Sequence, residues 1–167
     1  MISLKNFGVY PDPEDDFIRE PFIAMFMAGE FDFYVINIHS VYGDSAGERR
    51  EEARKLAGVY VVVQSRDSEN DVLLMGDFNL GPDDIGFQSL KAIPNMVYVN
   101  GEIPTSIKDK LYDNIWFQSH FTKEFTGRFG LIKFDEVLFG NDDKKASLIV
   151  SDQRPLWAEF DVSVDDD

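Results

Sequence analysis

Apolar and polar positions alternate along the chain in short blocks, and the period of each block predicts its secondary structure. Residues 21–29 (PFIAMFMAG) and 31–40 (FDFYVINIHS) are apolar runs of strand length that meet at Gly29-Glu30. Two such runs joined by a two-residue turn predict a β-hairpin. The residues before position 21 are interpreted as a polar lead.

Residues 43–64 form the longest stretch with helical periodicity. Ser45 and Glu48 have the spacing of a capping box at its start. The acidic cluster Glu48–Glu52 falls on the charged side of the predicted helix, so we expect it to be solvated. The predicted apolar stripe consists of Ala53, Leu56, Ala57, Tyr60 and Val61.

The remaining apolar runs predict short strands and one short helix. Residues 71–79 (DVLLMGDFN) are typical of a buried central strand that ends in a polar turn, and residues 83–93 predict a helix that Pro94 stops. Helices between strands indicate an α/β architecture with a mixed sheet, and the absence of repeats and linkers predicts one domain over residues 1–167. The other predicted strands are 96–100, 112–117, 146–151 and 155–162.

Composition narrows the class of protein. Of the 167 residues, 44% are hydrophobic and 14% aromatic, which excludes a disordered chain. No apolar run suits a membrane helix or a signal peptide, so no membrane partner is expected and the cytoplasm is favoured. The absence of cysteine excludes thiolate metal sites. The net charge of −15 should repel nucleic acid unless divalent cations or a local Lys/Arg patch bridge the contact.

Polar residues follow or open four of the apolar runs, where strand ends can meet at one rim of a sheet. Carboxylate oxygens bind Mg²⁺, an Asn amide can bind a phosphate oxygen, and a His can protonate a leaving group or orient a water. An Asp or Asn after a strand also commonly completes a turn, and a lone histidine is commonly structural, so spacing alone leaves both interpretations open. The residues are His39, Asp77 with Asn79, Asp113 with Asn114, and Asp152 with Gln153.

The motifs at these positions come in a recognisable order: IHS at 38–40, MGDFN at 75–79, YDNIWF at 112–117 and SDQRP at 151–155. In this order they resemble the endonuclease/exonuclease/phosphatase superfamily. The stretches FIREPF (17–22) and PTSIKDKLYDNIWF (104–117) narrow the resemblance to a bacterial deoxyribonuclease I-like branch, from about Tyr10 to Val162. The resemblance implies an α/β/β/α sandwich of two mixed sheets with an active site at one edge.

The same resemblance implies hydrolysis of phosphate esters with Mg²⁺, or with Mn²⁺ or Ca²⁺ in its place. Asp77, Asn79 and Asp152 would then bind metal and phosphate, and His39 would be one of two catalytic histidines. Metal charge and fixed donors would stabilise the negative charge that builds on the phosphate. The residues implied to contact nucleic acid, expected to be DNA, are Arg19, Asn114 and Arg154.

Position 153 departs from the family pattern Ser-Asp-His. Asp113 would orient the histidine of that pattern, but the residue here is Gln153. Glutamine donates and accepts hydrogen bonds but does not titrate, so it could hold a phosphate oxygen or a water. It cannot act as a general acid or base, a role worth roughly 10²–10⁴-fold in rate.

The resemblance also implies that the sequence starts partway through the family's pattern. The family's metal-binding Glu and the acidic partner of its first histidine have no counterpart, and neither Glu20 nor the cluster Glu48–Glu52 is expected to replace them. The apolar strands at 21–38 would need cover, which predicts a homo-oligomer, most simply a two-fold dimer, or a separate N-terminal half.

Three functions are compatible with these features. The first is a divalent-metal-dependent nuclease, an endonuclease on DNA by descent, whose active site is impaired or completed by a partner. The second is a catalytically silent remnant that acts as a binding or interaction module, and the third is a phosphoesterase acting on a phospholipid or small phosphate ester. FIREPF and the Asp113 strand favour the first over the third, whereas Gln153 and the lack of the family's Glu favour the second over the first.

Overall fold

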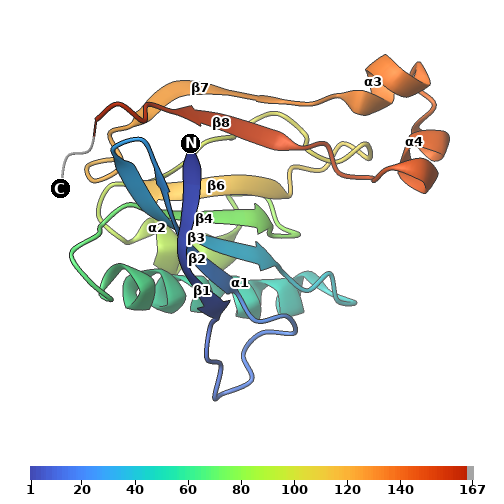
Figure 1. The fold of residues 1–167 in the computed structure, drawn as a ribbon. Coiled ribbons are helices and arrows are strands. Elements are labelled where there is room, and N and C mark those ends of the chain that lie inside the picture. The colour runs from blue at the N-terminus through green and yellow to red at the C-terminus, as the bar shows by residue number, and fades with distance from the viewer. Residues whose placement is uncertain (165–167) are drawn as a thin grey trace.

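The computed structural model describes residues 1–164, which form a six-stranded sheet, a two-stranded sheet and five helical segments (Figure 1). The six-stranded sheet has the strand order β1-β2-β3-β4-β6-β5. Its strands are β1 (Ile2–Val9), β2 (Phe22–Ala28), β3 (Phe31–His39), β4 (Val72–Asp77), β5 (Met96–Tyr98) and β6 (Asp113–Gln118). The smaller sheet pairs β7 (Phe125–Leu131) with β8 (Leu156–Phe160). The helical segments are α1 (Ala46–Gln64), η1 (Ile85–Phe87), α2 (Gln88–Lys91), α3 (Phe134–Phe139) and α4 (Asp143–Ile149).

The layers confirm the predicted combination of helices with two sheets. Helices α1 and α2 cover one face of the six-stranded sheet, and β7 and β8 lie on the other side (Figure 1). Helices α3 and α4 lie beyond one end of β7 and β8, so within residues 1–164 they do not form the outer helical layer of the predicted sandwich (Figure 1). None of the described helices is long and apolar enough to cross a membrane.

The chain path brings three strand ends to one edge of the larger sheet. β2 and β3 form the predicted antiparallel hairpin, and α1 then returns the chain so that β4 pairs in parallel with β3. β6 pairs antiparallel with β4. The last residues of β3 and β4 therefore lie beside the first residue of β6.

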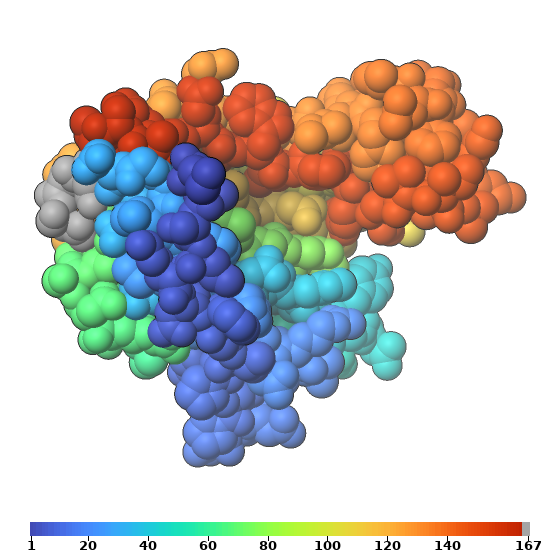
Figure 2. All heavy atoms as spheres, in the orientation of Figure 1, coloured from blue at the N-terminus to red at the C-terminus, as the bar shows by residue number. Residues whose placement is uncertain are grey.

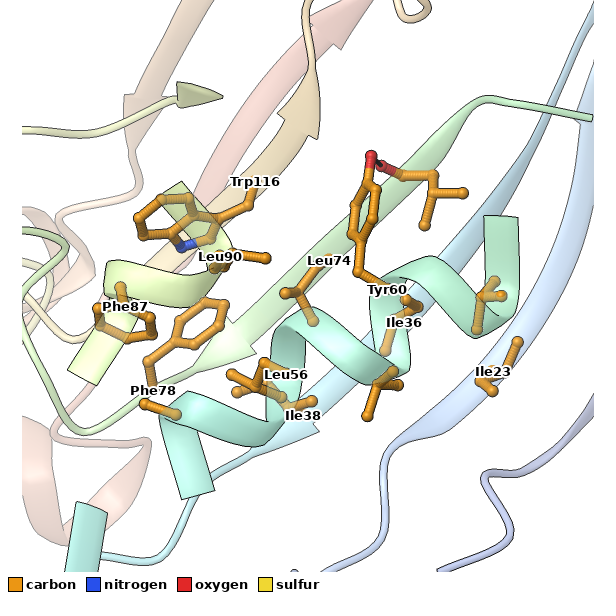
Figure 3. Close-up of a cluster of buried hydrophobic side chains, with 14 of the residues drawn as sticks. Ile23, Ile36, Ile38, Leu56, Tyr60, Leu74, Phe78, Phe87, Leu90 and Trp116 are labelled. Carbon is orange, nitrogen blue, oxygen red and sulfur yellow. Dashed lines mark hydrogen bonds between the residues drawn. The ribbon is translucent and has the colours of Figure 1, made fainter. Parts of the chain in front are cut away.

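A hydrophobic cluster between α1 and the six-stranded sheet holds this arrangement together (Figure 3). Helix α1 contributes Leu56 and Tyr60, and the Tyr60 hydroxyl donates a hydrogen bond to the Val72 carbonyl at 3.1 Å. The predicted stripe of α1 is partly wrong, since Val61 is 51% exposed. The cluster also contains Ile36, Ile38, Leu74, Phe78, Phe87, Leu90 and Trp116.

The expectation that the acidic cluster of α1 is solvated is wrong for Glu52. This side chain is only 4% exposed. Its two carboxylate oxygens accept hydrogen bonds from the backbone N–H groups of Ile18, at 2.9 Å, and Val41, at 2.8 Å. Glu52 thereby fixes the segment before Arg19 and the segment after His39, both of which border the site described below.

The variant Glu52→Ala is expected to lower the free energy of unfolding by about 1.5–3 kcal/mol, because two backbone donors lose a charged acceptor. Glu51→Ala serves as the control, since the Glu51 side chain is 71% exposed and its substitution should change stability by about 0.5 kcal/mol or less. Urea unfolding of both variants measures the difference. Equal stability of the two would show that the Glu52 hydrogen bonds contribute little.

The strand predicted over residues 146–151 is wrong, because these residues lie mostly in α4. The Asp142 side chain accepts a hydrogen bond from the Lys145 N–H at 3.0 Å and so caps a helix at this point. Strand β1 falls in the segment interpreted as a polar lead, and it is formed by pairing with β2. Strand β7 and helix α3 were not predicted either.

Strand β1 supplies part of the cover that the apolar strands at 21–38 were expected to need. It pairs along the edge of β2, and its own outer edge is then open within the described residues. A single charge, Lys5, and a bulge between Leu4 and Asn6 interrupt this edge. Its apolar side chains are between 52% and 64% exposed, namely Ile2, Leu4, Phe7 and Val9.

Candidate active site

Three of the predicted site residues lie in one row across neighbouring strands. His39 ends β3 and Asp77 ends β4, and the two are register partners in the parallel pair. Asp113 begins β6 and is the register partner of Asp77 on its other side. Gly76 has a φ of +137°, and a Cβ there would lie 2.0 Å from the Ile38 carbonyl oxygen, so only glycine allows β3 and β4 to approach in this way.

Two loops add polar groups to this row. Asp77 Oδ1 accepts a hydrogen bond from the Asn79 N–H at 2.8 Å, and the buried Asn79 side chain donates to the Ser40 carbonyl at 2.8 Å. Gln153 Nε2 donates to Asp77 Oδ2 at 3.2 Å, and His39 Nε2 lies 4.0 Å from the same oxygen. Asp77 is thus the centre of the site, with contacts from both neighbouring loops.

The loop that carries Asp152 and Gln153 is held by residues 105–107. The Ile107 N–H donates to the Asp152 carbonyl at 3.0 Å, and the Arg154 N–H donates to the Thr105 carbonyl at 2.6 Å. Gln153 also pairs with Ser106 as an isolated β-bridge. These backbone contacts place the Gln153 side chain against Asp77.

Burial perturbs both carboxyl groups of the row. Burial, together with the negative charge of Asp77, raises the pKa of Asp113 to about 6, against the effect of the Thr105 hydroxyl. Burial also raises the pKa of Asp77, while the Asn79 N–H and His39 act in the opposite direction. Within the described part of the chain, Asp113 Oδ2 and Gln153 Oε1 are buried and have no hydrogen-bond partner. Both atoms carry unused acceptor capacity beside the cleft.

The variant Asp113→Asn is expected to be more stable than the original chain at pH 7, because it removes the cost of an ionised, partly buried carboxylate. The expected gain is only about 1–2 kcal/mol, since the carboxyl is partly solvated. Its raised pKa means that the folded state keeps a proton that the unfolded state releases between about pH 4 and pH 6. The cost of ionised Asp113 therefore grows over this range and is absent below it. Urea unfolding from pH 4 to pH 7 tests this, and a stability difference that does not change with pH would contradict it.

The site opens into a cleft of about 570 Å³. Its mouth is the recess between the α3–α4 lobe, coloured orange, and the residues that follow β3, coloured cyan (Figure 2). His39, Asp77, Asn79, Asp152 and Gln153 all line it, which brings most of the predicted site together. Six further lining residues were not predicted from the sequence, namely Tyr42, Ser106, Lys108, Lys110, Tyr112 and Ser151. Lys108 and Lys110 could have been noticed in the sequence. They are separated by a single residue, in an acidic chain, just before the Asp113 motif.

The three residues predicted to contact nucleic acid lie in different surroundings. Arg19 is exposed, and its guanidinium donates to the His39 carbonyl at 3.2 Å. Asn114 is only 3% exposed, and its amide is occupied by the backbone N–H and C=O of Asn100. Arg154 makes two hydrogen bonds, at 3.0 and 2.5 Å, with the buried carboxylate of Asp135. Only Arg19 is therefore placed at the surface near the cleft.

The described residues do not by themselves form a complete metal site. No group of three or more His, Asp or Glu side chains within residues 1–164 is arranged to hold a cation. Both oxygens of Asp77 already accept hydrogen bonds, and Asp152 Oδ2 lies 3.5 Å from the Lys108 ammonium. Mg²⁺ commonly uses one or two protein carboxylates with waters and substrate phosphates. Asp77 and Asp152 could supply that minimum, but the other ligands would have to come from elsewhere.

Comparison with known proteins agrees with the motifs, although no family model matches the chain. Over 165 residues it is 32% identical to a protein named deoxyribonuclease from Thioalkalivibrio sp. (strain K90mix), covering 91% of this chain and 45% of that protein. Over 155 residues it is 26% identical to endonuclease/exonuclease/phosphatase family domain-containing protein 1 of Bos taurus, covering 84% of this chain and 27% of that protein. The chain therefore spans less than half the length of either relative.

A solved structure shows the fold. The endonuclease/exonuclease/phosphatase from Bacteroides vulgatus matches 96% of this chain and 66% of its own, with a TM-score of 0.60 at 12% identity. The resemblance predicted from the motifs is confirmed. The chain is similar in sequence to proteins with these names, and it shares the two-sheet fold of the Bacteroides vulgatus structure.

Proposed function

We propose that this chain carries the catalytic edge of a divalent-metal-dependent phosphodiesterase, and that its substrate is DNA. The observation that supports this most is the row His39, Asp77 and Asp113 at one sheet edge, with Asp152 and Gln153 in the same cleft. The name deoxyribonuclease of one relative favours DNA over a small phosphate ester.

In this proposal the side chains of the cleft have separate tasks. Asp77, Asn79 and Asp152 contribute to a shell for Mg²⁺, Mn²⁺ or Ca²⁺ that other ligands complete, and the cation would offset charge on the phosphate. The His39 side chain is 60% exposed and so can exchange a proton with a reacting oxygen. Lys108, whose ammonium lies 3.5 Å from Asp152 Oδ2, offers a positive charge to the phosphate.

The site is also expected to be impaired. Gln153 cannot exchange a proton, and its amide occupies the oxygen of Asp77 that faces His39. These two observations favour the alternative of a silent binding module over full activity. Activity would then depend on ligands from a partner, a second copy or a separate N-terminal half, and the open edge of β1 is the place where a further strand could pair.

Plasmid nicking tests the proposal. The chain is incubated with supercoiled DNA and Mg²⁺ or Mn²⁺, with EDTA in the control reaction. Nicking that EDTA abolishes would support a metal-dependent phosphodiesterase. The absence of nicking both by this chain and by its Gln153→His variant would contradict it and favour the silent module.

A further inference from the structure

A second hollow lies beside the active-site cleft, between the loop 105–112 and helix α4. Its volume is about 380 Å³. Ile107 and Leu148 form an apolar part, and Leu148 is 78% exposed although it carries no polar group. The lining residues are Ile107, Lys108, Asp143, Lys144, Ser147 and Leu148.

Lys108 connects the hollow with the cleft, because it lines both. Its ammonium lies 3.5 Å from Asp152 Oδ2, at the edge of the candidate active site. The turn that carries Lys108 is fixed, since the Lys108 N–H donates to Ser106 Oγ at 3.0 Å and the Asp109 N–H donates to the Ser106 carbonyl at 3.1 Å. A strand of nucleic acid that leaves the cleft past Lys108 would therefore reach the hollow.

The opposite wall of the hollow is fixed as well. Asp142 caps α4, and the buried Asp135 carboxylate binds Arg154, which ties the α3–α4 lobe to the loop of Asp152. The two lysines of the hollow stand out in a chain with a net charge of −15. Such a site pairs cations, which attract phosphates, with an aliphatic surface, which can cover the apolar face of a base.

We infer that this hollow binds the base of a nucleotide next to the one whose phosphate occupies the cleft, an inference that rests on the proposed function. Ile107 and Leu148 would contact the face of the base, and Lys108 and Lys144 the flanking phosphates. Asp143 and Ser147 offer hydrogen-bonding groups to the base edge. A base stacked in a duplex cannot enter such a pocket, so the preferred substrate is a single strand or an unpaired end.

Binding of a short fluorescent single strand, compared with the matched duplex, tests this inference. Phosphorothioate linkages prevent cutting, so that fluorescence anisotropy in Mg²⁺ measures binding alone. The test variants are Leu148→Asp and Lys144→Glu. Their matched controls are Leu138→Asp, a 71% exposed leucine of α3 outside the hollow, and Lys145→Glu, the neighbouring exposed lysine of α4.

The single strand is expected to bind more tightly than the duplex. Each test variant should weaken single-strand binding roughly tenfold, and each control should change it by about twofold or less. Equal binding of strand and duplex, equal behaviour of test and control variants, or no binding of the single strand would each overturn the inference. Plasmid nicking measured in parallel separates the two hypotheses, because nicking that the test variants do not alter would leave the proposed function intact.

Discussion

The variant Gln153→His is expected to hydrolyse DNA about 10²–10⁴-fold faster than the chain with Gln153, because it restores a titrating group at this position. Gln153 already reaches Asp77 Oδ2, and its Oε1 has no partner within the described residues. Asp113 Oδ2 is likewise buried without a partner and could accept a hydrogen bond from an imidazole N–H. A histidine at position 153 would therefore have two carboxylate oxygens nearby, those of Asp77 and Asp113, as hydrogen-bond acceptors.

Plasmid nicking at several pH values measures this gain. The control is Gln153→Ala, which removes the amide without adding a titrating group. If residue 153 acts as a general base, the rate of Gln153→His should rise with pH through about 6.5, the ordinary range of histidine. Equal rates of the histidine and alanine variants would show that freeing Asp77 matters and that proton transfer does not.

The sequence predicted the parts of the fold that depend on local pattern. The hairpin of β2 and β3, the capped start of α1 and the buried strand β4 follow from apolar runs and turn residues. Strand β1 could not be found in this way, because its mixed residues become a strand only through pairing with β2. The run at 146–151 has the apolar residues of a strand, but a capped helix without a sheet neighbour formed there.

The candidate site shows the same limit. His39, Asp77 and Asp113 follow strand ends or open a strand, so their motifs predicted a shared rim. Glu52 was misplaced because the stripe of α1 was centred on Ala53 and Ala57, although Glu52 is in phase with Leu56, Val59 and Val63. Lys108 and Lys110 line the cleft through loop geometry, which carries no periodic signal, so only their spacing in an acidic chain pointed to them.

The variant Asp77→Asn is expected to abolish nicking, both in the original chain and in the Gln153→His background, while the fold stays at least as stable. Asp77 is the only described residue that contacts the Asn79 backbone, Gln153 and His39 together. The amide of asparagine has no negative charge to offer a cation or a proton. The Oδ1 atom of the asparagine can still accept a hydrogen bond from the Asn79 N–H. If the Gln153 amide flips, its Oε1, which has no partner in the described residues, can accept a hydrogen bond from the Nδ2 group of the asparagine.

Stability and activity should therefore separate at Asp77. Because burial raises the pKa of Asp77, the ionised carboxylate costs free energy in the folded state, and this cost grows as the pH rises above the usual carboxyl range. Asp77→Asn removes it, so urea unfolding should show a stability gain that is larger at pH 7 than at pH 4. Asp83→Asn is the control, because the Asp83 side chain is 77% exposed and lies outside the cleft. An inactive but unfolded Asp77→Asn protein would point to a structural role for this carboxylate, whereas an inactive and stable one places it in the reaction.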